Sequence, residues 1–300
     1  MKLRGKIPLL AGIVLALTAA VFLSSCIKRQ SISLPLIADY ETETAGADRK
    51  NLKIGVVPGP YGDMYLEAVQ PLLAAKGYTA ELVFYSDFIR PNFSLAEKET
   101  DLNIFQHYRY LNDFKMQNDL DLSAITEIQT VSMGIFSNRY RTLSAAGSGI
   151  SVSIPNDSTN RSRALRVLDS ANVIVLNPAS DIARADISDI VSNPRNIRFI
   201  QLDAQALVAS LASVDMAVIN GNFAIAGGLN PSVALYNETL TEGYINVIAV
   251  RTDDLDRQFV RDIIDAVRSD RYINMIIDEN GKYSGFQRPR YFFGITEKRG

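Results

Sequence analysis

The chain has 300 residues, with 31 basic and 33 acidic side chains for a net charge of −2, and only one cysteine and one histidine. A mildly acidic chain without a basic cluster argues against nucleic acid as a partner. A single cysteine excludes an internal disulfide. Because the chain also has only one histidine, we expect no metal site, and we expect no cofactor.

The first 26 residues have the layout of an export signal. Three basic residues precede an apolar run of 17 residues, Ile7 to Leu23, which is shorter than the ~20 that span a bilayer comfortably. The LSSC stretch at its end resembles a bacterial lipobox, in which the cysteine is acylated and becomes the first residue of the mature protein. We therefore expect a signal peptide at 1–25 and a lipid anchor on Cys26, with an uncleaved anchor helix as the alternative.

The expected anchor places the protein in the cell envelope, tethered to a bacterial membrane with its body facing the periplasm or the exterior. Cleavage would remove three positive charges and move the net charge from −2 to −5. Residues 26–51 are rich in Ser, Thr, Ala and charge without sustained periodicity, which is typical of a flexible tether. About 245 residues remain, enough for one large α/β domain or two lobes.

From Leu52 the chain alternates short apolar strands with amphipathic helical segments. Strands and helices are predicted in turn at 52–57, 63–77, 79–85, 91–99, 101–106 and 108–118. This alternation predicts βαβ units around a largely parallel sheet. A long β-rich run at 124–137 interrupts this alternation, which then resumes from Ile150 to Gly228. Within the second stretch, the alternation predicts a helix at 186–193.

A second β-rich run at 243–251 and two helical segments within 255–278 complete the chain. We expect two α/β lobes joined by two extended crossings, with the second lobe inserted into the first. The predicted boundaries are 52–137 plus 245–293 for lobe 1 and 138–244 for lobe 2.

Signatures of catalysis and of nucleotide binding are absent from the sequence. G-x-S-x-G does not occur, and His107 would have to serve any catalytic triad alone. The GVVPGPYG stretch has three glycines after a strand, but not in a nucleotide-binding spacing.

Polar and aromatic residues gather where predicted strands end, which is where open α/β sheets bind ligands. One strand leads to Phe105, Gln106 and His107, a second leads to Asn220, and a third leads into the polar segment 156–163. Taken singly, each has a structural alternative: a buried structural histidine, a helix cap at Asn220, or core aromatics.

The order of these residues resembles a known family. SDFIRPNFSLAEKETDLNIFQHYRYL (86–111), VSIPNDSTNRSRAL (152–165) and VDMAVINGNFAIAGGLNP (214–231) are similar to three signature stretches of the NlpA-type methionine-binding lipoproteins. GYINVIAVR (243–251) is similar to a fourth. These proteins are the substrate-binding components of methionine ABC importers. The resemblance runs from about Leu52 to Ile277, with the lipobox upstream.

The resemblance implies an α/β fold of the periplasmic-binding-protein kind, type II-like. It would have two lobes joined by two crossing strands, with the ligand held in the cleft between the lobes. Arg163 would pair with an α-carboxylate, and asparagine oxygens would accept from an α-ammonium. Aromatic rings would hold a thioether side chain. Arg161, two residues from Arg163 on a helix, would face elsewhere. Carried over by position, the ligand-binding residues would be Phe88, Phe105, His107, Tyr110, Asn160, Arg163, Asn220, Tyr244 and Asn246.

Three positions depart from the family pattern. Phe88 stands where the family commonly has tyrosine, and Arg109 stands where it has proline. Ser158 replaces a second proline, which loosens the turn but allows Ser158 or Thr159 to cap the following helix.

We therefore expect a lipoprotein that captures L-methionine, a closely related amino acid or a methionine dipeptide and delivers it to an ABC importer. Its partners would be the permease and ATPase of that importer, and the lipid bilayer through acylated Cys26. A surface lipoprotein with a structural or host-interaction role is one alternative. An enzyme on the same fold that uses His107 as an acid or base is the other.

Overall fold

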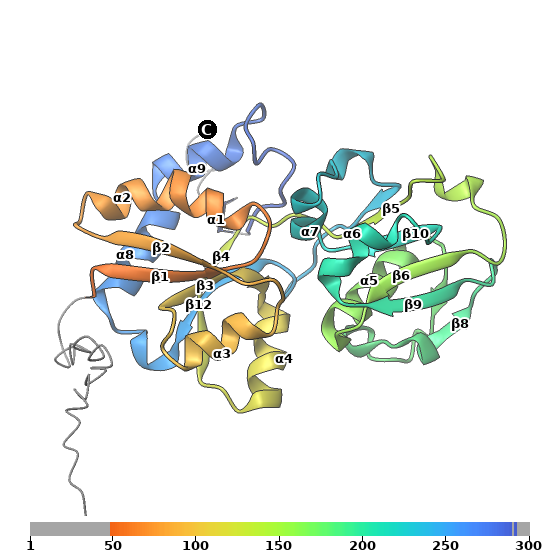
Figure 1. The fold of residues 1–300 in the computed structure, drawn as a ribbon, viewed down its shortest axis with the longest axis horizontal. Helices are drawn as coiled ribbons and strands as arrows, with labels where there is room; N and C mark the ends of the chain where they lie inside the picture. The colour runs from red at the N-terminus through yellow and green to blue at the C-terminus, as the bar shows by residue number, and fades with distance from the viewer. Residues whose placement is uncertain (1–48, 290, 293–300) are drawn as a thin grey trace, which may run out of the picture. The chain divides into compact units, whose positions relative to one another are not determined.

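The computed structural model describes residues 49–289 and 291–292, which form two five-stranded sheets with helices packed on them (Figure 1). The expected signal peptide, the lipid anchor on Cys26 and the tether up to residue 48 lie outside the described residues. The sequence assigns Asn51 to the tether, but Asn51 is the first residue of strand β1 and pairs with Thr79. No helix among the described residues is both long and apolar enough to cross a bilayer.

The first lobe is built on a sheet with the strand order β2-β1-β3-β12-β4. Strand β1 pairs in parallel with β2 and β3, whereas β12 returns from late in the chain and runs antiparallel to β3 and β4. The sheet is therefore mixed and not largely parallel. Its strands are β1 (Asn51–Val56), β2 (Thr79–Phe84), β3 (Leu102–His107), β4 (Leu122–Ile128) and β12 (Asn246–Arg251).

Helices cover both faces of the first sheet, with α3 and α4 opposite α2 and α9 (Figure 1). In α8, Phe259, Ile263 and Val267 repeat at helical spacing and are buried, which docks the helix on the sheet core. The single helix predicted at 63–77 contains a π-helical turn before Pro71, which has no N–H to donate to a regular helix. The helical segments are α1 (Tyr61–Met64), η1 (Tyr65–Val69), α2 (Gln70–Ala74), α3 (Arg90–Ala96), α4 (Tyr108–Asn118), η7 (Thr252–Asp254), α8 (Gln258–Val267) and α9 (Asp270–Ile277).

The second lobe has the strand order β11-β5-β10-β6-β9. Strand β10 runs parallel to β6 but antiparallel to β5, which follows the first crossing. The β-rich run at 124–137 thus divides between the two sheets, and β5 lies in the second sheet although the predicted boundary leaves it in lobe 1. The strands are β5 (Gly134–Phe136), β6 (Ser151–Pro155), β9 (Arg198–Leu202), β10 (Met216–Ile219) and β11 (Tyr236–Asn237).

Helix α5 is the longest helix of the second lobe, and Leu165 and Leu168 bury its apolar side in the lobe core. The segment 186–193, which the alternation places as a helix, forms a 3-10 turn and then strand β8, which pairs with β7. The remaining elements are η2 (Leu143–Ala145), α5 (Ser158–Ser170), β7 (Val175–Leu176), η3 (Ile182–Arg184), η4 (Ile187–Asp189), β8 (Ile190–Ser192), η5 (Ala204–Ala206), α6 (Leu207–Ser210), α7 (Gly221–Ala226) and η6 (Pro231–Val233).

Candidate functional site

Helix α5 begins in the polar segment that follows strand β6. Asp157 caps the helix, and its carboxylate accepts a hydrogen bond of 2.8 Å from the amide nitrogen of Asn160. The cap predicted at Ser158 or Thr159 is wrong, because the Asp157 carboxylate both accepts this bond and meets the positive end of the helix. The first turn then directs Asn160 and Arg163, which are three residues apart, to the same side.

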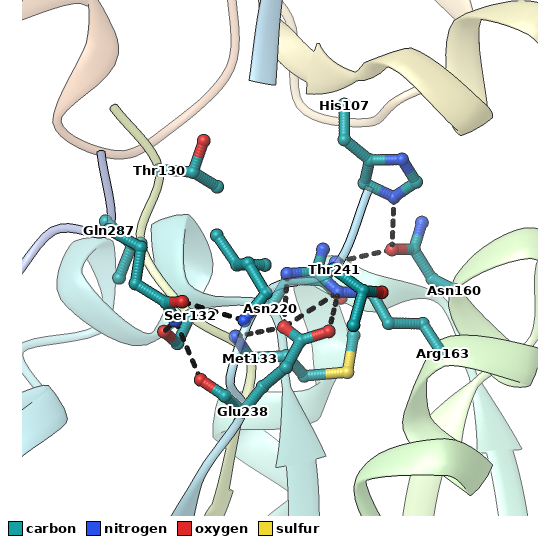
Figure 2. A network of polar contacts seen from close by, with 12 residues as sticks. His107, Thr130, Ser132, Met133, Asn160, Arg163, Asn220, Glu238, Thr241 and Gln287 are labelled. Carbon is teal, nitrogen blue, oxygen red and sulfur yellow. Dashed lines mark hydrogen bonds and ion pairs between the residues drawn. The ribbon is translucent and has the colours of Figure 1, made fainter. Parts of the chain in front are cut away.

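Arg163 is buried, with 3 % of its surface exposed, and its charge is paired within the protein (Figure 2). Nε donates to both carboxylate oxygens of Glu238 at 2.9 and 3.0 Å, and Nη2 donates to one of them at 2.6 Å. These three bonds use Nε and Nη2 of the guanidinium. Burial alone would lower the pKa of Arg163, but Glu238 raises it, so the guanidinium stays charged. Arg161 turns away and pairs with Asp186 at 2.9 Å.

Two asparagines meet beside Arg163. Asn220 precedes α7, and its Nδ2 donates to Oδ1 of Asn160 at 2.8 Å. Asn220 occupies the N-cap position of α7, as the alternative has it, but its side chain makes no capping hydrogen bond. Its Oδ1 is buried and has no hydrogen-bond partner within the described part of the chain. Such an acceptor is costly to leave unpaired, and a ligand N–H would satisfy it.

His107 ends strand β3 and caps helix α4. It is therefore a buried structural histidine, as the alternative proposed, and it also lies in the pocket lining. Its Nδ1 accepts a hydrogen bond from the Tyr110 amide nitrogen at 3.1 Å. The proton of the neutral ring is therefore on Nε2, which lies 3.4 Å from Oδ1 of Asn160. Burial, followed by the charge of Arg163, holds the pKa of His107 well below its usual range, and the ring is neutral at pH 7.

Aromatic rings form the apolar wall of the pocket. Phe88 and Phe105 stack with their ring centres 5.8 Å apart, and Phe223 of α7 lies 5.0 Å from Phe88. The Tyr110 ring meets Phe88 edge-on, and its hydroxyl donates to the Phe88 carbonyl at 3.1 Å. Asn246 donates from Nδ2 to the Phe105 carbonyl at 3.2 Å, which fixes the base of this wall. Phe223 comes from the second lobe and packs on Phe88, but it is not in the pocket lining.

The polar and aromatic groups line one pocket, whose space of about 330 Å³ between atoms includes open solvent. The structure brings eight of the nine expected residues into its lining: Phe88, Phe105, His107, Tyr110, Asn160, Arg163, Asn220 and Asn246. Tyr244 is not in the lining and lies behind His107, with the ring centres 5.0 Å apart. The structure places Tyr244 outside this lining, and its contact with a ligand stays a prediction.

The pocket also contains residues that the family resemblance does not assign. Gln106 stands at a predicted strand end, which signalled it, and Gly221 and Asn222 directly follow Asn220, where the same signal could have found them. No strand end marked Tyr61 or Val131 in the sequence. In the structure the two residues meet, and the Tyr61 hydroxyl accepts a 3.1 Å hydrogen bond from the Val131 amide nitrogen. Glu238, which pairs with Arg163 but is not in the pocket lining, gave no signal either, because it follows a strand of only two residues.

The positions that depart from the family pattern have clear environments. Phe88 needs no hydroxyl partner, because its ring packs on Phe223. The Arg109 guanidinium lies 5.7 Å from the centre of the Tyr244 ring and is absent from the pocket lining. Ser158 is the first residue of helix α5. None of the three displaces Arg163 or Asn220.

Two α/β lobes, two crossing segments and a small buried pocket lined from both sheets define the class of periplasmic-type solute-binding proteins. The profile described as NlpA lipoprotein matches residues 52–290. This protein belongs to the NlpA lipoprotein family.

Curated relatives and solved structures agree with this assignment. The D-methionine-binding lipoprotein MetQ of Escherichia coli (strain K12) is 30 % identical over 242 residues, which cover 78 % of this chain and 89 % of that protein. Outer membrane lipoprotein 2 of Mannheimia haemolytica is 29 % identical over 242 residues, 80 % of this chain and 85 % of that protein. A nutrient binding protein from Burkholderia cenocepacia bound to methionine has a TM-score of 0.71 at 31 % identity, covering 76 % of this chain and 96 % of that one. These names describe lipoproteins and binding proteins and not enzymes.

Proposed function

We propose that this protein is a membrane-anchored solute-binding lipoprotein that captures L-methionine, a closely related amino acid or a methionine dipeptide. One pocket carries the proposal, because it combines a buried guanidinium, a buried unpaired amide oxygen and an aromatic wall. A free amino acid presents the three complementary groups: a carboxylate, an ammonium and a side chain.

The polar half of the pocket suits the backbone of an amino acid. Glu238 occupies Nε and Nη2 of Arg163, so Nη1 is the group that would donate to a ligand carboxylate. Oδ1 of Asn160 is already used by Asn220, which leaves Oδ1 of Asn220 to accept from the ammonium. This assigns separate roles to two asparagines that the sequence treats alike.

The apolar half suits an unbranched side chain of moderate length. Phe88, Phe105 and Tyr110 offer ring faces and edges, and sulfur–aromatic contacts contribute about 0.3–1.5 kcal/mol each. Other apolar side chains fit rings as well, so methionine is proposed on the combined grounds of this wall and the methionine-binding relatives.

The mechanism we propose is capture without turnover. His107 has its Nδ1 engaged by the Tyr110 amide and a pKa too low for it to hold a proton at neutral pH. The chain has no second histidine, and its one cysteine lies in the expected lipobox. It therefore offers few side chains that could act as a nucleophile or as an acid–base pair. The lobes would close on the ligand by hinge motion and present it to the permease.

The proposed setting is a bacterial membrane surface, with acylated Cys26 in the bilayer and the two-lobed body in the periplasm or outside the cell. The ABC importer permease and its ATPase are the proposed partners. The relative from Streptococcus pneumoniae, described as the substrate binding protein of a methionine transporter, supports this role with a TM-score of 0.73 and 29 % identity.

The test is native mass spectrometry of the body from residue 49 onward, followed by calorimetric titration with L-methionine, D-methionine and methionine dipeptides. Arg163→Ala should abolish binding, a loss of about 2–5 kcal/mol or more. Arg161→Ala is the matched control, because Arg161 lies on the same helix but pairs with Asp186 outside the pocket.

Arg163→Ala leaves Glu238 buried without its partner, so circular dichroism must show that the variant is folded. If it is not, Arg163→Gln combined with Glu238→Gln removes both charges and should also fail to bind. Undiminished affinity in a folded variant would refute the assigned pocket. A wild-type body that binds none of these ligands would favour the surface lipoprotein with a structural or host-interaction role.

A further inference from the structure

The carboxylate of Glu238 lies directly behind the proposed ligand-binding guanidinium. Both side chains are buried, with 4 % of the Arg163 side chain and 8 % of the Glu238 side chain exposed, and three hydrogen bonds join them. The Met133 amide nitrogen donates to Oε2 of Glu238 at 3.2 Å, and the side chain of Gln287 donates to its carbonyl at 2.7 Å. Glu238 is therefore held in place from the first crossing and from the C-terminal segment (Figure 2).

The pair makes the polar end of the pocket electrically neutral. Within the described residues that line the pocket, Arg163 is the only side chain charged at pH 7. Burial raises the pKa of Tyr61 to about 12, and burial holds the pKa of His107 well below its usual range, so neither of these adds a charge. Glu238 thus cancels the one charge in the wall.

The charged side chains outside the pocket lining do not give the site a net positive charge. Asp157 lies beside Asn160 and Arg109 lies beside the Tyr244 ring, and these two have opposite signs. Arg166, the next cation, hydrogen-bonds Thr241 at an exposed position, where solvent screens it.

We infer that Glu238 sets the charge selectivity of the site: by neutralising Arg163, it makes the pocket accept net-neutral zwitterions and reject ligands with a net negative charge. The inference rests on the proposed function. A zwitterion brings one carboxylate and one ammonium, so the buried charge stays zero after binding. A 2-oxo acid brings only the carboxylate, which must share one guanidinium with Glu238 and leaves an uncompensated buried anion.

Glu238 acts through Arg163 and is a positioning residue. A merely structural role would lower the affinity for all ligands alike. The selectivity role changes the ratio between ligands of different charge, and that ratio is the quantity to measure.

The experiment titrates the body from residue 49 onward with L-methionine and with its 2-oxo acid, which has the same side chain but a net charge of −1. In the wild-type protein the amino acid should bind at least ~100-fold more tightly. In Glu238→Gln that ratio should fall at least ~10-fold, because the freed guanidinium favours the anion, and in Glu238→Asp the ratio should stay near the wild-type value.

Asp262→Asn is the control for loss of a buried acid, because Asp262 is paired with Lys76 in the first lobe, and it should leave the ratio unchanged. A folded Glu238→Gln protein with a ratio within twofold of the wild type overturns the inference. If Glu238→Gln does not fold, the wild type still decides. The 2-oxo acid should bind no more tightly than the cationic methionine amide, and a 2-oxo acid that binds more tightly than the amide overturns the inference. A wild type that binds neither methionine nor its 2-oxo acid overturns the proposed function, and the inference with it.

Discussion

Gln287 and Thr130 exchange two backbone hydrogen bonds of 2.9 and 2.8 Å, although Thr130 precedes the second lobe in the sequence and Gln287 follows it. Thr130 lies in the crossing from β4 to β5, and Gln287 lies beyond α9. The Gln287 side chain also reaches the second crossing: Oε1 accepts from the Leu240 amide at 2.7 Å, and Nε2 donates to the Glu238 carbonyl and to Ser132 Oγ. One C-terminal residue thus ties both crossings together.

Replacing Gln287 by alanine should loosen this link. The variant loses three side-chain hydrogen bonds, each contributing about 0.5–1.5 kcal/mol, so we expect the free energy of unfolding to fall by about 2 kcal/mol. Urea denaturation measures this change. Gln205→Ala, at an exposed position in η5, is the control and should leave the midpoint unchanged. Equal midpoints for the two variants would contradict the assigned role.

Stability should depend on pH through His107. Its folded pKa lies well below the unfolded value of about 6.5, so the unfolded chain takes up a proton first as the pH falls. Stability is therefore fully present above about pH 6.5 and declines below it, by up to about 1.4 kcal/mol per pH unit.

The chain has no other histidine, so His107→Gln should remove this decline between pH 6.5 and 5.5. The measurement is urea denaturation of both proteins at pH 7.5, 6.5 and 5.5, a range that lies above the usual carboxylate pKa values. The same decline in both proteins would mean that His107 does not hold a lowered pKa.

Tyr244→Phe should be tolerated. The Tyr244 hydroxyl is buried without a hydrogen-bond partner in the described part of the chain, so its removal costs nothing and relieves an unpaired group. The ring should matter: the Arg166 and Arg163 guanidinium groups lie 4.7 and 5.5 Å from its centre, and His107 packs against it. Tyr244→Ala should lose about 3–5 kcal/mol of stability and weaken binding. A loss of affinity in Tyr244→Phe would instead argue that the hydroxyl meets the ligand.

Gly221 allows α7 to approach the first crossing closely. A Cβ there would lie 2.3 Å from Val131 Cγ1 and 2.4 Å from the Ser132 carbonyl oxygen, and the backbone oxygen cannot move aside alone. Gly221→Ala should cost about 1–3 kcal/mol of stability and weaken ligand binding, because Asn220 must move with the helix start. Thermal unfolding and calorimetry measure both effects. Gly147→Ala, which has open space around its Cβ, should change neither.

Much of the candidate site could be predicted from local sequence. Phe105 and His107 lie at the end of strand β3 in the first sheet, Asn220 follows strand β10 in the second sheet, and ligands of open α/β sheets bind beyond the carboxyl ends of the strands. The family resemblance selected Arg163 over Arg161, and the structure places Arg163 in the pocket lining and Arg161 against Asp186. The strand-end predictions need only periodicity, which is a property of short segments, whereas the choice of Arg163 rests on the family resemblance.

The exact residues at which each lobe begins and ends remain a prediction. The run at 124–137 has uniform β character, and nothing within it tells that β4 pairs with β12 while β5 pairs with β10. The choice between sheets depends on partners more than 75 residues away, so short-range patterns do not encode it.

By itself, the sequence determined the alternation of strands and helices, the expected lipid anchor and the residue types of a small polar and aromatic pocket. Only the tertiary structure decided that Glu238 holds Arg163, that Asn160 satisfies Asn220 on one side only, and that Tyr244 stands behind His107. The physical reason is that buried charges and amides take their partners from whatever the fold brings within about 3 Å, and residues far apart in the chain meet there without any pattern that links them.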